Sequence, residues 1–268
     1  CLGTQPIFLA GAAERHRERL EAASAGRAMA AFAMTEESAG SDVGGMRTRA
    51  QRTADGWVLD GAKRYISNAG LADFHVVFAV TDASGERPAL SCFLVPAGTE
   101  GLEFVGAQEM SEPHPLGEIA FHDCALPESS LIGEEGGGFA LGFATLDRLR
   151  ASVAAAACGM AARALAEART WAAQRRQFGR PLAAFQLVQQ KLAVMATELD
   201  AARLLTYRAA DAADSGSSDV TLHSAMAKWF ATEAAQRIID QAVQIHGGAG
   251  VLRDAHVDRL YRAVRALR

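Results

Sequence analysis

The spacing of apolar residues changes twice along the chain. In the middle part of the chain the spacing is typical of short strands. Between residues 28 and 134, apolar runs such as "FHVVFAV" (74–80), "ALSCFLV" (89–95) and "GEIAFHD" (117–123) alternate with turn-forming residues. In "GWVLDGAKRYIS", Gly56 and Asp60-Gly61 flank an apolar triplet, which predicts a hairpin. Six to eight strands so closely spaced leave no room for crossover helices. The pattern therefore favours a small barrel or sandwich over a parallel Rossmann sheet.

The parts on either side of this region have helical spacing. Residues 1–27 are rich in helix formers and close at Gly26. From 135 to 268, Ala and Leu recur every three to four residues in three long stretches, and a fourth helix is expected near Val257. The loop "SGSSD" (215–219) and the pair Gly247-Gly248 separate them. We therefore predict an α+β protein: the end of a helical domain (1–27), a middle β domain (28–134) and an antiparallel four-helix bundle (135–268).

Composition excludes several classes of function. The 268 residues carry a formal net charge of −4, which gives no electrostatic footprint for nucleic acid. We expect no membrane span, because no apolar run approaches about 20 residues, and we find no secretory signal. The four cysteines lack metal-site spacing, so they predict free buried thiols in a reducing cytoplasm and no bound metal; they are Cys1, Cys92, Cys124 and Cys158.

Small and hydroxyl-bearing residues crowd the turn "MTEESAGSDV", which follows a short apolar run. Gly40 leaves room for a ligand to approach the backbone, while Thr35 and Ser41 offer hydroxyl groups. A flavin ring requires this kind of edge, since its polar atoms need fixed donors and its faces need flat contacts. Tyr65 and Ser67 in "RYISNAG" supply an aromatic ring and another hydroxyl. Either stretch by itself is also compatible with an ordinary turn.

Two further stretches interrupt the alanine-rich bundle. In "RRQFGRPLAAFQ" (175–186), Arg175 and Arg176 are suited to phosphate groups, Phe178-Gly179 is expected to break a helix, and Pro181 to restart it. In "QIHGGAG" (244–250), the two glycines by themselves are also compatible with a simple helix cap. The histidine of this stretch is more typical of a packed or capping residue than of a catalyst.

Taken together, these four stretches resemble the signatures of the acyl-CoA dehydrogenase family of flavoproteins, in the family's order. "MTEESAGSD" is similar to "TEP-x-AGSD", and "KRYISNAG" to "K-x-W-I-T-N-G". "RRQFGRPLAAFQLVQQKLAVM" and "QIHGGAGVLRDAHVDRLYR" resemble two helical signatures. The resemblance covers residues from about Gly26 to Arg268. It implies a family fold in which FAD lies between the β domain and the bundle.

The resemblance assigns a cofactor role to thirteen positions, with Thr35 near the N5/O4 edge of the flavin. Those expected to line the ring are Phe32, Met34, Thr35, Gly40, Ser41, Tyr65 and Ser67. Those expected to reach the FAD of a neighbouring subunit are Arg175, Gln177 and Phe178, with Gln244, Gly247 and Gly248 near its diphosphate and ribose. Asp147, Arg150 and Ser41 match positions that touch the CoA part of the substrate.

By the same resemblance, the reaction is α,β-dehydrogenation of an acyl-CoA thioester in fatty acid metabolism, with electrons passed to an electron-transfer flavoprotein. A carboxylate removes the α proton, and the β hydrogen leaves as hydride to flavin N5. Members of the family are usually tetramers or dimers, so a homo-oligomer is expected.

Three departures from the family pattern keep other functions open. The usual catalytic Glu is expected beyond Arg268, in the parent of what reads as a fragment that is inactive alone, and the alternative position for it holds Leu149. Glu37-Ser38 and the loop "EMSEPHPLGEIAF" (109–121) also differ from the family. An acyl-CoA oxidase, a flavin monooxygenase, an acyl-carrier-protein-linked dehydrogenase and a non-enzymatic partner subunit remain alternatives.

Overall fold

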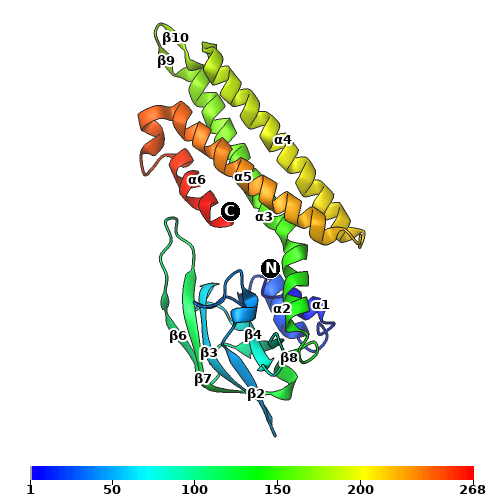
Figure 1. The fold of residues 1–268 in the computed structure, drawn as a ribbon. Helices are drawn as coiled ribbons and strands as arrows, with labels where there is room; N and C mark the ends of the chain where they lie inside the picture. Colours follow the sequence, from blue (N-terminus) through cyan, green and yellow to red (C-terminus); the bar gives the residue numbers. More distant parts are fainter. Residues whose placement is uncertain (1) are drawn as a thin grey trace. The chain divides into compact units, whose positions relative to one another are not determined.

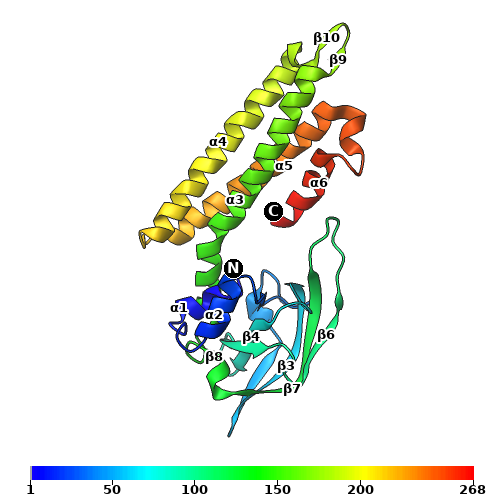
Figure 2. The ribbon, with the colours of Figure 1, turned by 180° about the vertical axis from the view of Figure 1, so that it is seen from behind.

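The computed structural model describes residues 2–268, which form two compact units (Figures 1 and 2). The first ends at Leu146 and the second begins at Asp147. The first unit contains two short helices and an eight-stranded mixed sheet. The second contains the long helices of the bundle. The helix α3 (Gly138–Gln174) begins in the first unit and continues into the second.

The two N-terminal helices pack on one face of the sheet. They are α1 (Gln5–Leu9) and α2 (Arg17–Ser24), and the chain leaves α2 through Gly26 at a φ of 69°. Ile7 and Leu20 are buried in a cluster with Val76 and Phe78 of the sheet. The helical character predicted for residues 1–27 is thus present, and its apolar residues form part of the core of the first unit.

The sheet has the order β6-β7-β3-β2-β4-β5-β8, with β1 paired to β4. The strands are β1 (Ala30–Ala33), β2 (Arg49–Thr53), β3 (Gly56–Ser67), β4 (Phe74–Asp82), β5 (Ala89–Pro96), β6 (Leu102–Ala107), β7 (Leu116–Pro127) and β8 (Leu131–Ile132). The pairing of β4 with β1 and β2 is parallel, and the other pairs are antiparallel. β4 is buried on both faces, which explains its unbroken apolar run.

The hairpin predicted at Asp60-Gly61 is wrong. β3 runs straight through both residues, and the turn lies instead at residues 54–55, between β2 and β3. Gly61 marks an irregularity in the pairing with β7, at a φ of 137°. A Cβ atom there would lie 2.6 Å from Thr48 Cα. The glycine therefore permits a close approach of two backbones rather than a turn.

The second unit is built on small side chains. Its helices are α3, α4 (Gln186–Asp214), α5 (Val220–His246) and α6 (His256–Val264). Alanines of α3 and α5 that are almost fully buried form much of its core; they are Ala154, Ala157, Ala161, Ala164, Ala168, Ala227, Ala231, Ala234, Ala235 and Ala242. Because alanine adds little bulk beyond the backbone, helices that meet through it can pack with short interaxial distances.

By length and composition, α3 is apolar enough to cross a membrane. The prediction that no segment approaches this length is therefore wrong for α3, because its many alanines make an 18-residue window apolar. Some of these alanines line the core of the bundle, and 33% of the window is buried. Among the other described helices, none passes it.

The cysteines that the structure describes are free and buried. Burial raises the pKa of Cys92 and Cys158, and it raises the pKa of Cys124 to about 11 with a smaller contribution from Asp60. These thiols are therefore protonated near neutral pH and behave as small apolar side chains. Cys1 lies outside the described residues.

The contact at Gly61 gives a test of the sheet geometry. Gly61→Ala should lower the free energy of unfolding by at least about 2 kcal/mol more than Gly98→Ala, as measured by urea denaturation. Both glycines have a positive φ, but a Cβ on Gly98 meets nothing within 4 Å. Gly98→Ala therefore measures the cost of a positive φ in open space, and equal losses in the two variants would contradict the crowding at Thr48.

Candidate active site

A bulge in β3 ties the turn after β1 to the end of this strand. The register with β7 shifts between Lys63 and Ile66, and within this bulge the N–H groups of Arg64 and Tyr65 bond to acceptors outside β7. Arg64 donates its N–H to the carbonyl of Thr35 at 2.9 Å. Tyr65 donates its N–H to Gln108 Oε1 at 3.1 Å. The structure thereby brings Thr35 next to the strand that carries Tyr65 and Ser67.

Tyr65 has a backbone conformation that is uncommon for a bulky residue. Its φ is 58°, and 54% of its surface is exposed. Such strain persists only where the surroundings hold the residue in place, and it gathers at ligand sites. The bond to Gln108 is one of these constraints. The result is a flat ring offered to solvent close to the exposed hydroxyl group of Ser67.

The other predicted flavin residues of the β domain differ in exposure. Phe32 is half-buried and packs against Phe78 with ring centroids 5.0 Å apart, and Met34 is only 7% exposed. Gly40 and Ser41 lie in an exposed turn. The first two residues thus anchor the turn in the core, while the last two leave its surface open to a ligand.

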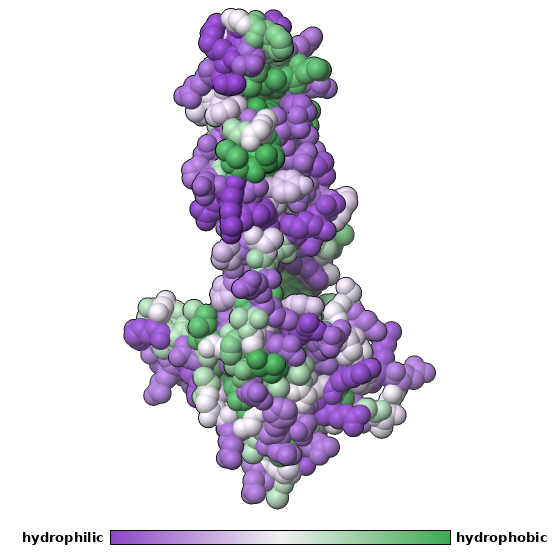
Figure 3. Space-filling model, turned by 90° about the vertical axis from the view of Figure 1, so that its left-hand side faces the viewer, coloured by the Kyte–Doolittle hydropathy of each residue, from purple (hydrophilic) through white to green (hydrophobic). Residues whose placement is uncertain are grey.

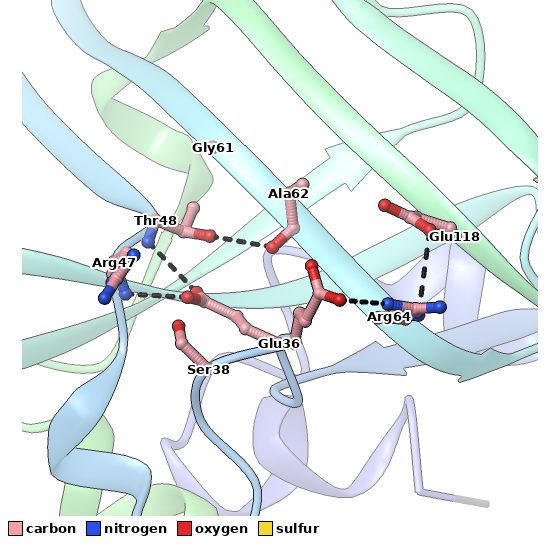
Figure 4. A pocket seen from close by; sticks show the side chains of 9 residues that line it. Glu36, Ser38, Arg47, Thr48, Gly61, Ala62, Arg64 and Glu118 are labelled. Atoms are coloured by element: carbon pink, nitrogen blue, oxygen red, sulfur yellow. Dashed lines mark hydrogen bonds and ion pairs between the residues drawn. The ribbon is translucent and has the colours of Figure 1, made fainter.

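A buried ion pair fixes the base of this turn. Lys63 Nζ lies 2.7 Å from Glu36 Oε1, and both side chains are almost fully buried. Lys63 also donates to the carbonyl of Met34 at 3.3 Å. The carboxylate of Glu36 accepts the N–H groups of Arg47, at 2.7 Å, and Thr48, at 3.0 Å (Figure 4). One pair therefore joins the turn, the segment before β2 and the strand β3.

The charges of this pair are set by opposing effects. Burial lowers the pKa of Lys63 to about 8, and the attraction of Glu36 offsets only part of this shift. Burial raises the pKa of Glu36, but Lys63 and the hydrogen bonds from Thr48 and Arg47 outweigh this effect and hold it below its ordinary value. Both groups are therefore charged at neutral pH.

A polar pocket of about 450 Å³ lies beside the same turn. Arg64 lies between two acids, with its Nη1 2.7 Å from Glu37 Oε1 and its Nε 3.9 Å from Glu118 Oε2 (Figure 4). Glu37 is one of the residues that depart from the family signature. In this structure its side chain forms an ion pair with Arg64 at the surface.

In the bundle, the stretch after α3 forms a hairpin instead of a simple helix break. β9 (Arg176–Gln177) pairs with β10 (Arg180–Pro181), and the turn residues Phe178 and Gly179 have φ values of 51° and 79°. The prediction that Pro181 restarts a helix is wrong, because it ends β10 and precedes a short 3-10 helix, Leu182–Ala184.

The tip of this hairpin is open to solvent. Phe178 is 92% exposed, an unfavourable position for an apolar ring unless a partner covers it. Arg175 and Gln177 are also exposed. None of the ion pairs among the described residues involves Arg175. Its guanidinium group therefore remains available for an anion.

The second glycine-rich stretch caps α5. Gly247, at a φ of 60°, donates its N–H to the carbonyl of Gln244, and Gly248 is exposed beside it. His246 stacks on Trp171 with ring centroids 5.0 Å apart, and its Nδ1 lies 2.7 Å from the carbonyl oxygen of Ala242. The histidine is thus packed, as its sequence context indicates, and the exposed backbone of the glycines is left for a ligand.

Two of the three residues predicted to touch CoA, Asp147 and Arg150, pair with each other. Arg150 forms an ion pair with Asp147 one turn away on α3. The second oxygen of Asp147 accepts the hydroxyl group of Thr221, at the start of α5, at 2.6 Å. This pair therefore holds two helices together, and a role toward substrate remains a prediction.

The described residues contain no group of three or more His, Cys, Asp or Glu side chains arranged to hold a metal ion.

The acyl-CoA dehydrogenase middle-domain family model matches residues 31–124, and the C-terminal-domain model matches residues 136–268. The chain belongs to the acyl-CoA dehydrogenase family. The two matches confirm the resemblance found in the sequence. Members of this family are flavoprotein oxidoreductases.

Individual relatives agree with this assignment. A probable acyl-CoA dehydrogenase of Mycobacterium tuberculosis, FadE25, is 40% identical over 264 residues, which cover 97% of this chain and 68% of that protein. Butyryl-CoA dehydrogenase from Megasphaera elsdenii has a TM-score of 0.96 at 36% identity, over 99% of this chain and 70% of that one. This similarity confirms the predicted fold class, a β domain followed by a helical domain.

A third similar structure is described as an electron transferring flavoprotein of Acidaminococcus fermentans. One of its chains has a TM-score of 0.93 at 37% identity, over 98% of this chain and 69% of that one.

Four residues that shape the turn after β1 and the end of β3 are not identified by the sequence patterns. Glu36 and Lys63 lie inside the quoted signatures, where a charged residue in a turn or at the end of a strand gives no sign of burial. Gln108 and His114 lie at or near the loop that departs from the family. Their partners are more than 40 residues away in sequence, so no local pattern could identify them.

The ion pair beneath the turn can be tested by removing one charge. Lys63→Met should lower the free energy of unfolding by about 3–5 kcal/mol in urea, because the carboxylate of Glu36 is left buried without its cation. Arg64→Met, which removes a partner of the 83%-exposed Glu37 side chain, should cost less than about 1 kcal/mol. If the two variants unfold alike, the pair does not anchor the turn.

Proposed function

We propose that this chain is part of an FAD-dependent enzyme that dehydrogenates acyl-CoA thioesters and passes electrons to an electron-transfer flavoprotein. The observation that carries the proposal is the bond between Arg64 and Thr35, which joins the first signature to the strand of the second. This hydrogen bond brings the turn that carries Thr35 next to the strand that carries the strained, exposed Tyr65 and the hydroxyl group of Ser67.

These residues fit a flavin by their chemistry. Thr35, Ser41 and Ser67 offer hydroxyl groups that donate or accept, and Tyr65 offers a flat apolar surface. Gly40 leaves the backbone of the turn open. In the bundle, Arg175 and the backbone of Gly247-Gly248 fit the charged phosphates of FAD.

The chain's own residues would bind and orient the reactants. Bound FAD supplies the hydride acceptor for the β hydrogen of the substrate. Thr35 and Ser67 would fix the ring by hydrogen bonds, and Arg150 would meet the CoA part with the guanidinium donors that Asp147 does not use. Leu149, at one of the two family positions for the base, has no group that accepts a proton, so the base must be another residue.

Similar proteins support the substrate class and the partner. One solved structure with this fold is a butyryl-CoA dehydrogenase, and another belongs to an electron transferring flavoprotein. Both are more than 35% identical to this chain. The acyl length and the electron acceptor are the parts of the proposal that experiment must decide.

An oligomer of identical chains is part of the proposal. Leu222, Met226 and Trp229 follow one another at helical spacing on α5, and each is 40% or more exposed. Apolar residues also gather among polar ones on the face of the bundle in Figure 3. A second copy that covers these side chains and Phe178 would remove apolar surface from water. It would also bring the Arg175 hairpin to a neighbouring flavin.

The activity is tested by anaerobic titration. The FAD-loaded full-length protein should lose the visible absorption of oxidised flavin when an acyl-CoA of suitable length is added. Free CoA serves as the control and should leave the band unchanged. Persistence of the band with short, medium, long and branched acyl-CoA would overturn the dehydrogenase proposal, and peroxide release in air would favour the oxidase.

The role of the hairpin is tested separately. Arg175→Ala should weaken FAD binding about tenfold or more, because a charge-assisted hydrogen bond contributes about 1.5–3 kcal/mol. Arg169→Ala, an exposed arginine on the same helix, is the control. Light scattering should give at least a dimer for the wild-type protein and for both variants. A monomer, or equal FAD affinity in the two variants, would contradict the shared site.

A further inference from the structure

The loop that departs from the family pattern reaches back to the proposed flavin site. It connects β6 to β7, and it carries His114, whose Nε2 lies 2.8 Å from Ser67 Oγ. Ser67 is one of the hydroxyl residues expected at the ring. The same loop begins with Gln108, which binds the strained N–H of Tyr65. Two side chains of one loop thus contact two neighbouring positions of the proposed site.

The backbone of this loop is fixed where it carries the histidine. His114 lies between Pro113 and Pro115, so its own conformation and that of its neighbours are restricted. The carbonyl of Pro115 accepts the N–H of Asn68 at 2.8 Å, next to Ser67 in sequence. Little backbone freedom is therefore lost when the loop places the imidazole beside the hydroxyl group.

The contact constrains the single proton of Ser67. If Nε2 of the imidazole accepts, the hydroxyl proton is committed to the histidine and only the lone pairs of Oγ face a ligand. If Nε2 carries a proton, it donates to Oγ, and the hydroxyl proton is free to be donated to the ligand. An oxidised flavin offers acceptor nitrogens along its edge, and a reduced flavin offers an N–H group. The two arrangements therefore favour different redox states.

We propose that His114 is a positioning residue that sets the direction of the Ser67 hydrogen bond to the flavin and thereby the redox balance of the bound ring. This inference rests on the flavin site of the proposed function. It assigns a use to the loop before β7, in the stretch 109–121 that departs from the family pattern. His114 itself acts through Ser67 and does not take part in bond making.

The test is a double-mutant cycle read by the reduction potential of bound flavin. His114→Ala should change the ratio of the affinities for reduced and oxidised flavin about tenfold, which for a two-electron couple is about 30 mV. Ser67→Ala should give a shift of its own, and adding His114→Ala to it should change nothing further. His114→Gln, which keeps a group that donates and accepts, should restore part of the wild-type value.

A matched control separates positioning from general effects. His122 is another exposed histidine, on β7 beside Glu103, and His122→Ala should leave the potential unchanged. Independent, additive shifts from His114 and Ser67, or no shift from His114, would overturn the inference while flavin binding upholds the cofactor site. If the wild-type protein binds no flavin, the proposed function fails and this inference fails with it. Should His114→Ala not fold, His114→Gln in the Ser67→Ala background gives the same comparison.

Discussion

The bulge in β3 is the constraint on which the proposed site depends. In a regular strand successive N–H groups point to opposite sides, so only one of Arg64 and Tyr65 could donate to β7. Here they are turned to Thr35 and Gln108, which lie in two different loops. A local defect in one ladder thus organises three segments that are far apart in sequence. It also holds Tyr65 in a conformation that a regular strand would not give.

Burial makes this arrangement rigid. Glu36 and Lys63 have exchanged water for each other and for backbone groups of Met34, Arg47 and Thr48. Such a pair is weak evidence for net stability, since desolvation consumes most of the attraction. It does impose a unique geometry, because each charge has only one set of partners inside the core. The turn that carries Thr35 is therefore held by two contacts: the ion pair of Glu36 with Lys63, and the hydrogen bond from Arg64 in the bulge.

The bundle follows a different rule. Alanines form much of its core, together with larger residues such as Leu199, Ile238 and Ile239, while other large apolar residues lie on the outside. Trp229, Leu222 and Phe178 are large apolar residues that remain exposed. This distribution is what a subunit requires if its outer face is to be covered by another chain.

The sequence by itself determined the kinds of element and their order, because hydrophobic periodicity and glycine signals act over a few residues. It also identified the family, since four signatures in a fixed order are specific. It misread Asp60-Gly61 as a turn and Pro181 as a helix start, because both depend on a neighbouring strand.

Only the tertiary structure decided which of the polar residues meet. Lys63 with Glu36 and His114 with Ser67 are contacts across 27 and 47 residues. They follow from strand register and loop closure, which arise from backbone hydrogen bonds between distant segments. Local periodicity carries no information about those bonds.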